Sequence, residues 1–128
     1  MNGLHLIADL YRCQCPPDLL IDRDVLETLC VDECRGAGLT PLGAYFYQFL
    51  HDDGQKAGVT GTVVLAESHL AIHTWPESGD VTLDVYVCNF SRDNSERARQ
   101  VFSRVLDALK PQDSACHDVI RGKILAEA

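Results

Sequence analysis

The sequence has no long apolar run and no excess of positive charge, and each absence excludes a class of protein. Its longest apolar runs are strand-sized, such as residues 63–66, so we expect no membrane-spanning segment. Lysine and arginine number 11 against 19 aspartates and glutamates, which gives a formal net charge of −8. A chain of this charge repels phosphate backbones, and we expect no nucleic-acid partner.

A secretory leader and a metal-binding cysteine framework are also missing. Residues 1–5 lack the basic start and apolar segment of a signal peptide, so we expect a cytoplasmic protein whose six cysteines stay reduced. Of the two close pairs, Cys13-x-Cys15 and Cys30-x₃-Cys34, only the second has the spacing of a zinc pair. That pair falls on a predicted helix, and we expect no metal ion.

The 128 residues have the length of one domain, and no repeat or linker divides them. We therefore predict a single domain over residues 1–128. Apolar–polar alternation predicts strands, and apolar residues at helical spacing predict helices. The predicted strands cover residues 3–11, 42–50, 59–66, 69–74 and 81–88, with a short one near 119–120. The predicted helices run from Asp22 or Asp24 to about Gly36 or Gly38, and from Ala98 to Leu109.

This order of elements, with neighbouring strands linked as hairpins, predicts an α+β fold. We expect a two-layer sandwich: a mainly antiparallel sheet with two helices on one face. The strand at 81–88 has one fully apolar face and one mixed face, the latter with Tyr86 and Cys88. Because two helices cover only one face, we expect the sheets of two copies to stack in a homodimer.

The densest chemical cluster lies at predicted strand ends and turns between residues 67 and 77. It contains Glu67, Ser68, His69, His73 and Glu77, and positions 69 and 73 share one strand face. A serine near a histidine suggests an acyl-transfer nucleophile, but the glycine-flanked elbow of serine hydrolases is missing. The alternative is a hairpin whose polar side chains are simply hydrogen-bonded.

The run AESHLAIHTWPE, residues 66–77, closely resembles the self-processing signature of prokaryotic S-adenosylmethionine decarboxylases. These are pyruvoyl enzymes of polyamine biosynthesis. The resemblance extends over most of the chain, and the spacing of Ser68, His73 and Cys88 agrees with the short bacterial and archaeal class. It implies a decarboxylase that acts on S-adenosylmethionine and makes the aminopropyl donor for spermidine.

The same resemblance implies that the chain cuts itself between Glu67 and Ser68. Decarboxylation needs an electron sink that no ordinary side chain provides. In the family, attack of the serine hydroxyl on the preceding carbonyl leads to a pyruvoyl group, whose carbonyl forms a Schiff base with the substrate amine. Here Ser68 would be its precursor, and the products would be residues 1–67 and 68–128.

Further roles follow from the resemblance, each beside a simpler alternative. His73 would be the proton acceptor in processing, supported by Thr60, where the family commonly has serine, and by Thr62. An imidazole suits this step because its pKa lies near the working pH. Cys88 would be the proton donor in catalysis; the alternative is a small buried apolar residue.

Two more residues would bind substrate. Glu77 would bind hydroxyl and amine groups, against the alternative of a solvated turn carboxylate. Phe49 would stack on adenine, against the alternative of an ordinary core aromatic. Trp75 precedes Pro76 in a predicted turn, and we expect it to be a packing residue.

The chain departs from the family pattern mainly near the substrate side. Tyr47 and Gln48 replace a commoner His-Arg pair, residues 52–56 form an extra polar stretch, and Asn89 stands where glycine is usual. These changes leave a related pyruvoyl-dependent arginine or ornithine decarboxylase as a rival. A second rival is a non-catalytic regulatory homologue, which would stay uncut.

Overall fold

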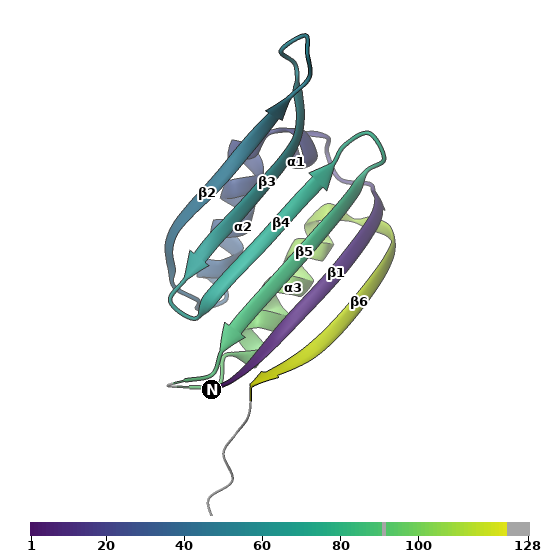
Figure 1. The fold of residues 1–128 in the computed structure, drawn as a ribbon. Helices are drawn as coiled ribbons and strands as arrows, with labels where there is room; N and C mark the ends of the chain where they lie inside the picture. Colours follow the sequence, from purple (N-terminus) through teal and green to yellow (C-terminus); the bar gives the residue numbers. More distant parts are fainter. Residues whose placement is uncertain (91, 123–128) are drawn as a thin grey trace, which may run out of the picture.

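The computed structural model describes residues 1–90 and 92–122, and within them three helices lie against one face of a six-stranded sheet (Figure 1). The strands are β1 (Asn2–Cys13), β2 (Pro41–Leu50), β3 (Lys56–Leu65), β4 (Ser68–Trp75), β5 (Asp80–Cys88) and β6 (Pro111–Gly122). The helices are α1 (Asp18–Ile21), α2 (Arg23–Gly36) and α3 (Ser95–Leu109). Neighbouring strands pair antiparallel in the order β2-β3-β4-β5-β1-β6, which confirms the predicted α+β two-layer class.

Two elements differ from the prediction. A third helix, the four-residue α1, follows Pro16 and Pro17, where we expected only a break. Pro17 has φ −54° and ψ −30°, both in the helical region. The proline ring fixes φ at a value that also suits the start of a helix. Strand β6 spans 12 residues instead of a short piece near 119–120. It is an exposed edge strand, so no buried apolar face gives it an alternating pattern.

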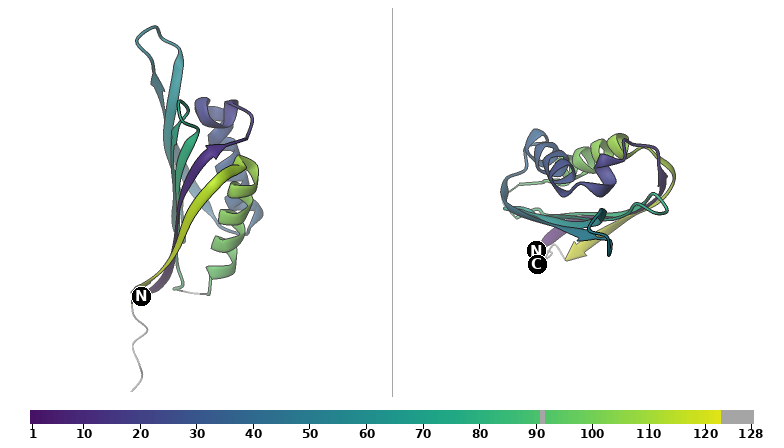
Figure 2. Two further views of the ribbon diagram at one scale, coloured as in Figure 1. Left: turned by 90° about the vertical axis from the view of Figure 1, so that its right-hand side faces the viewer. Right: turned by 90° about the horizontal axis from the view of Figure 1, so that it is seen from above.

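The core lies between the helices and the covered face of the sheet (Figure 2, left). The predicted apolar faces of β1 and β5 are buried there, and α3 contributes a matching apolar stripe. The strand residues are Leu4, Leu6, Ala8 and Leu10, and Val81, Leu83, Val85 and Val87. Among the described residues, no helix is both long enough and apolar enough to cross a membrane.

The opposite face of the sheet is bare in a single chain, as both views of Figure 2 show. Residues that alternate with buried ones place large apolar side chains on it: Tyr45, Tyr47 and Phe49 on β2, Val64 on β3, and Trp75 on β4. Tyr45 is 71% exposed. We call this surface the open face.

Gly61 of β3 pairs with Phe46 of β2, and the buried ring lies directly over the glycine. A Cβ atom at Gly61 would overlap this ring, so we expect Gly61→Ala to lower the free energy of unfolding by about 1–3 kcal/mol. Gly43, on the neighbouring strand, has open space around it, and Gly43→Ala should change the value by less than about 1 kcal/mol. Urea unfolding of both variants tests this, and equal losses would contradict it.

Candidate active site

Strand β4 carries Ser68 and His73, two of the predicted processing residues, toward opposite ends. Ser68 is its first residue and pairs with Leu65 and Val87, whereas His73 pairs with Thr60 and Thr82. Five residues at about 3.3 Å each separate Ser68 from His73 by about 17 Å along the strand. Within one chain, the predicted site residues therefore fall into two groups.

The first group lies where β4 begins and β5 ends. A pocket of about 360 Å³ there is lined by Ala66, Glu67, Ser68, Cys88, Phe90, Arg92 and Asn94. Three of these residues, Glu67, Ser68 and Cys88, are ones for which the sequence predicts roles in cleavage or catalysis. The last six residues of the predicted second product, 123–128, lie outside the described part of the chain.

Both ends of Glu67 are held in place. Its backbone carbonyl accepts a hydrogen bond of 2.7 Å from the Cys88 N–H. Its carboxylate accepts hydrogen bonds from the Thr40 N–H at 2.9 Å and the Thr40 hydroxyl at 3.0 Å. The carbonyl that Ser68 would attack thus already has a donor on the oxygen that would gain negative charge.

Ser68 has φ +150°, outside the range that residues with a side chain ordinarily adopt. Such a conformation costs about 1–3 kcal/mol and persists only where the surrounding structure imposes it. Here the β-ladder on both sides and the fixed Glu67 impose it. Backbone strain is therefore stored at the residue that would be converted.

A loop after β5 holds Cys88 from its carbonyl side. The side chain of Asn94, 3% exposed, donates a hydrogen bond of 3.0 Å to the Cys88 carbonyl. The Asn94 N–H donates to the Asn89 side-chain oxygen at 2.9 Å, and the Asn89 N–H donates to the Asn2 carbonyl at 2.8 Å. Asn89 and Asn94 thus link the end of β5 to the start of α3, and the Asn89 N–H links it to β1. Asn94 could not be predicted from the sequence, because its role depends on this contact.

The cysteines differ in accessibility. Cys88 is half-buried, and Cys116 is exposed on β6. Cys30 and Cys34 face the core from α2; burial raises the pKa of both thiols, that of Cys34 to about 12. Burial also raises the pKa of Cys13 to about 11. Among the residues that the structure describes, no three or more histidine, cysteine or acidic side chains are grouped to hold a metal ion.

These differences predict an order of alkylation. With iodoacetamide at pH 8, Cys116 and Cys88 should react first, while Cys30 and Cys34 should stay unmodified until the protein unfolds, because neutral buried thiols are poor nucleophiles. Peptide mass spectrometry with and without urea measures this, with Cys88→Ser as the control that assigns the Cys88 signal. Modification of Cys30 in the folded protein before Cys88 would contradict the prediction.

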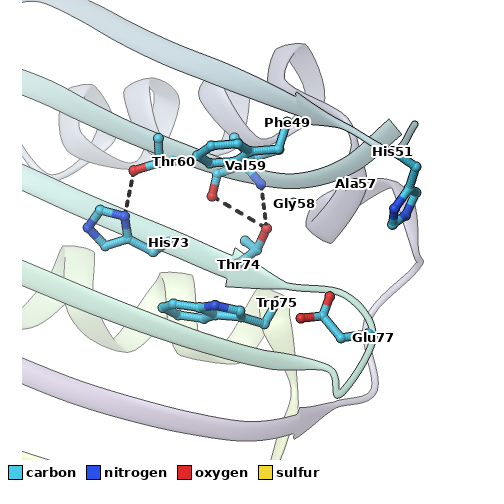
Figure 3. Close-up of a pocket in the computed structure, with 10 residues that line it drawn as sticks. All are labelled: Phe49, His51, Ala57, Gly58, Val59, Thr60, His73, Thr74, Trp75 and Glu77. Atoms are coloured by element: carbon cyan, nitrogen blue, oxygen red, sulfur yellow. Dashed lines mark hydrogen bonds between the residues drawn. The ribbon is translucent and has the colours of Figure 1, made fainter. Parts of the chain in front are cut away.

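The second group of predicted residues lines a pocket of about 560 Å³ at the other end of β4 (Figure 3). Four of its lining residues are predicted site residues: Phe49, Thr60, His73 and Glu77. The full lining is Phe49, His51, Ala57, Gly58, Val59, Thr60, His73, Thr74, Trp75 and Glu77.

His73 and Thr60 form a pair across β3 and β4. The Thr60 hydroxyl lies 2.5 Å from His73 Nδ1, which fixes the orientation of the imidazole. The structure thus brings Thr60 to His73, and both lie far from Ser68 of the same chain. Thr62 pairs with Ala71 and lines neither pocket.

Two aromatic rings border the second pocket. Phe49 is 48% exposed and Trp75 is 44% exposed, and they come from different strands (Figure 3). The expectation of a packing role for Trp75 was wrong: it is the last residue of β4 and lies on the open face, so its ring stays accessible. His51 was also missed, because it follows β2 in a polar stretch without a pattern.

This strand order, with an open aromatic face and a serine at a strained strand start, can be compared with known proteins. The sequence profile described as S-adenosylmethionine decarboxylase matches residues 4–122. The chain belongs to this family. The resemblance drawn from residues 66–77 is thereby confirmed.

Individual S-adenosylmethionine decarboxylase family members agree with this assignment. The chain is 33% identical to the S-adenosylmethionine decarboxylase proenzyme of Thermoplasma acidophilum over 98% of its own length and 88% of that protein. It is 37% identical to the proenzyme of Aquifex aeolicus over 91% of its own length and 79% of that protein. The crystal structure of the adenosylmethionine decarboxylase from Aquifex aeolicus superimposes with a TM-score of 0.83 at 32% identity, covering 98% of this chain and 95% of that one.

Proposed function

We propose that the chain is a self-processing S-adenosylmethionine decarboxylase that supplies decarboxylated S-adenosylmethionine for spermidine synthesis. Family membership supports the activity, and the relatives named above are described as proenzymes. The observation that carries the self-cleavage is the Glu67–Ser68 peptide, with its carbonyl held by the Cys88 N–H and strain at Ser68. The cytoplasmic location stays a prediction.

The cleavage we propose begins with attack of the Ser68 hydroxyl on the Glu67 carbonyl. The Cys88 N–H stabilises the developing oxyanion, and the peptide bond becomes an ester between Glu67 and the Ser68 side chain. Loss of the Ser68 Cα proton then eliminates the Glu67 carboxylate and leaves a dehydroalanine. Hydrolysis consumes one water, releases ammonia and leaves a pyruvoyl group at position 68.

The pyruvoyl carbonyl supplies the electron sink for decarboxylation. Cys88 is placed to return a proton to the substrate, because it lines the same pocket as Ser68 and is half-buried. Its backbone and side chain would thus serve successive stages: the N–H in cleavage and the thiol in turnover.

His73 cannot act on Ser68 of its own chain, because about 17 Å of strand separates them. We propose that His73 of a second copy does so in a homodimer. If the open faces of two copies stack with their β4 strands antiparallel, the His73 end of each lies over the Ser68 end of the other. The exposed aromatic side chains of the open face support such stacking.

A cluster of aromatic side chains near Cys88 also supports the proposal that a second chain covers the open face. The rings of His5, His69 and Tyr86 lie 5.5–6.4 Å apart. His5 Nε2 is buried, 4.0 Å from the Asp84 carboxylate, and has no hydrogen-bond partner among the described residues. Burial lowers the pKa of His5, so the neutral ring is favoured. A second chain could supply the missing partner.

The 560 Å³ pocket favours a nucleoside substrate over a linear amino acid. Phe49 and Trp75 offer two accessible aromatic surfaces, which suit the stacking of a purine and the attraction of a sulfonium cation. The Glu77 carboxylate borders the same space and would accept hydrogen bonds from ribose hydroxyls. An arginine guanidinium would also stack on one of these rings, but neither arginine nor ornithine has the ribose hydroxyls that Glu77 would bind.

Self-cleavage is tested by the mass of the intact purified protein beside Ser68→Ala. We expect fragments 1–67 and 68–128, with the second carrying a blocked N-terminus, and a single uncut chain for the variant. Carbon dioxide should then be released from carboxyl-labelled S-adenosylmethionine but not from labelled arginine or ornithine. A wild-type chain that stays whole would favour the regulatory homologue, and release from arginine would refute the substrate assignment.

The shared-site proposal is tested by coexpressing a His73→Ala chain with a Ser68→Ala chain of different tag length. Expressed alone, the Ser68→Ala chain should stay uncut because it lacks the nucleophile. The His73→Ala chain alone should be cut 10²- to 10⁴-fold more slowly because it lacks the base. Together, the His73→Ala chain should be cut, since the Ser68→Ala partner supplies His73. Mixed dimers in which it stays uncut would show that His73 acts within one chain or not at all.

A further inference from the structure

The side chain of Gln48 connects three segments of the chain. Its Oε1 accepts a hydrogen bond of 3.0 Å from the Arg23 N–H, at the first residue of α2. Its Nε2 lies 3.1 Å from the Phe49 carbonyl, 3.4 Å from that of Ala57 and 3.3 Å from that of Gly58. Both halves of the carboxamide are therefore used, the oxygen toward the helix and the nitrogen toward the β2–β3 hairpin.

The hairpin is irregular at this point. Gln48 pairs with Val59 and Leu50 pairs with Lys56, so two residues of β3, Ala57 and Gly58, face the single Phe49 of β2. This is a β-bulge, which disturbs the ladder and re-aims the side chains around it. The Gln48 amide binds the carbonyls that the bulge takes out of register.

The bulge forms part of the wall of the 560 Å³ pocket. Phe49, Ala57 and Gly58 all line it (Figure 3). Gly58 lies so close to the Thr74 carbonyl that a Cβ atom would not fit. Beyond the bulge the hairpin extends past the rest of the sheet (Figure 1), where a 2.8 Å ion pair between Lys56 and Asp22 also ties it to the start of α2.

We propose that Gln48 is a positioning residue for substrate binding: its carboxamide fixes the bulge and thereby the orientation of the Phe49 ring. Gln48 does not line the pocket, so it acts through Phe49 and not on the substrate. The proposal rests on the proposed function, because it concerns affinity for the planar base of S-adenosylmethionine. The Gln48 side chain makes its hydrogen bonds to Arg23, Phe49 and the bulge, and none of them goes to His73 or Thr60, so self-cleavage should not depend on Gln48.

The test is steady-state kinetics of the processed enzyme with Gln48→Glu. This change keeps an oxygen acceptor for the Arg23 N–H but removes the two donor hydrogens. We expect KM for S-adenosylmethionine to rise about tenfold, as the loss of one hydrogen bond to a part-buried carbonyl implies, with kcat within about twofold and cleavage unchanged. Gln55→Glu, in the exposed turn of the same hairpin, is the matched control for added charge and should leave KM unchanged.

A double-mutant cycle separates this role from a merely structural one. If Gln48 acts through Phe49, the effect of Gln48→Glu on KM should largely vanish in a Phe49→Leu background. Gln48→Met, which carries no charge, should raise KM similarly and replaces the glutamate variant if that variant does not fold. An unchanged KM in the folded variant, or an undiminished effect in Phe49→Leu, would overturn the proposal. An uncut or inactive wild-type chain would instead refute the proposed function.

Discussion

The helices cover only one face of the sheet, and the positions of the other features depend on this one-sided packing. Strands β1, β3, β4 and β5 send alternate side chains into the core, so the remaining positions are free for chemistry. His73, Tyr86 and Cys88 all alternate with buried neighbours on their strands. The core is then mostly apolar, with the hydrogen-bonded Thr74 as a buried polar residue of the sheet, while polar and aromatic groups gather on the face without helices.

The two pockets at opposite ends of β4 contain different groups that the proposed reaction needs. One contains the Glu67–Ser68 peptide, where we propose cleavage, and the Cys88 thiol; the other contains the His73 imidazole, two aromatic rings and the Glu77 carboxylate. Neither pocket contains all the groups that the proposed reaction needs. About 17 Å of strand separates the two groups within one chain, and the two-fold symmetry of the proposed homodimer would bring them together.

Period-two alternation was enough to predict strands with one buried face, as in the series Val81 to Val87, whereas β2 was predicted from its aromatic residues. The roles of Glu67, Ser68 and Cys88 were predicted from the resemblance of residues 66–77 to the family signature, and the structure brings these three residues to one pocket. Three other roles could not be predicted. That of Trp75 depends on the open face, that of Asn94 on the Cys88 carbonyl and that of Gln48 on the β-bulge. None of these features produces a periodic hydrophobic pattern in the sequence, and an exposed edge strand such as β6 produces only a weak one.

The strand order also governs what a cut at Glu67–Ser68 would leave behind. The first product would carry β1, β2 and β3, and the second would carry β4, β5 and β6. In the sheet, β1 lies between β5 and β6, while β3 lies against β4. The two products would be interleaved, joined by three complete strand interfaces, and could separate only by unfolding. No covalent bond between the two products would be needed to keep them associated, because the pairing of their strands holds them together.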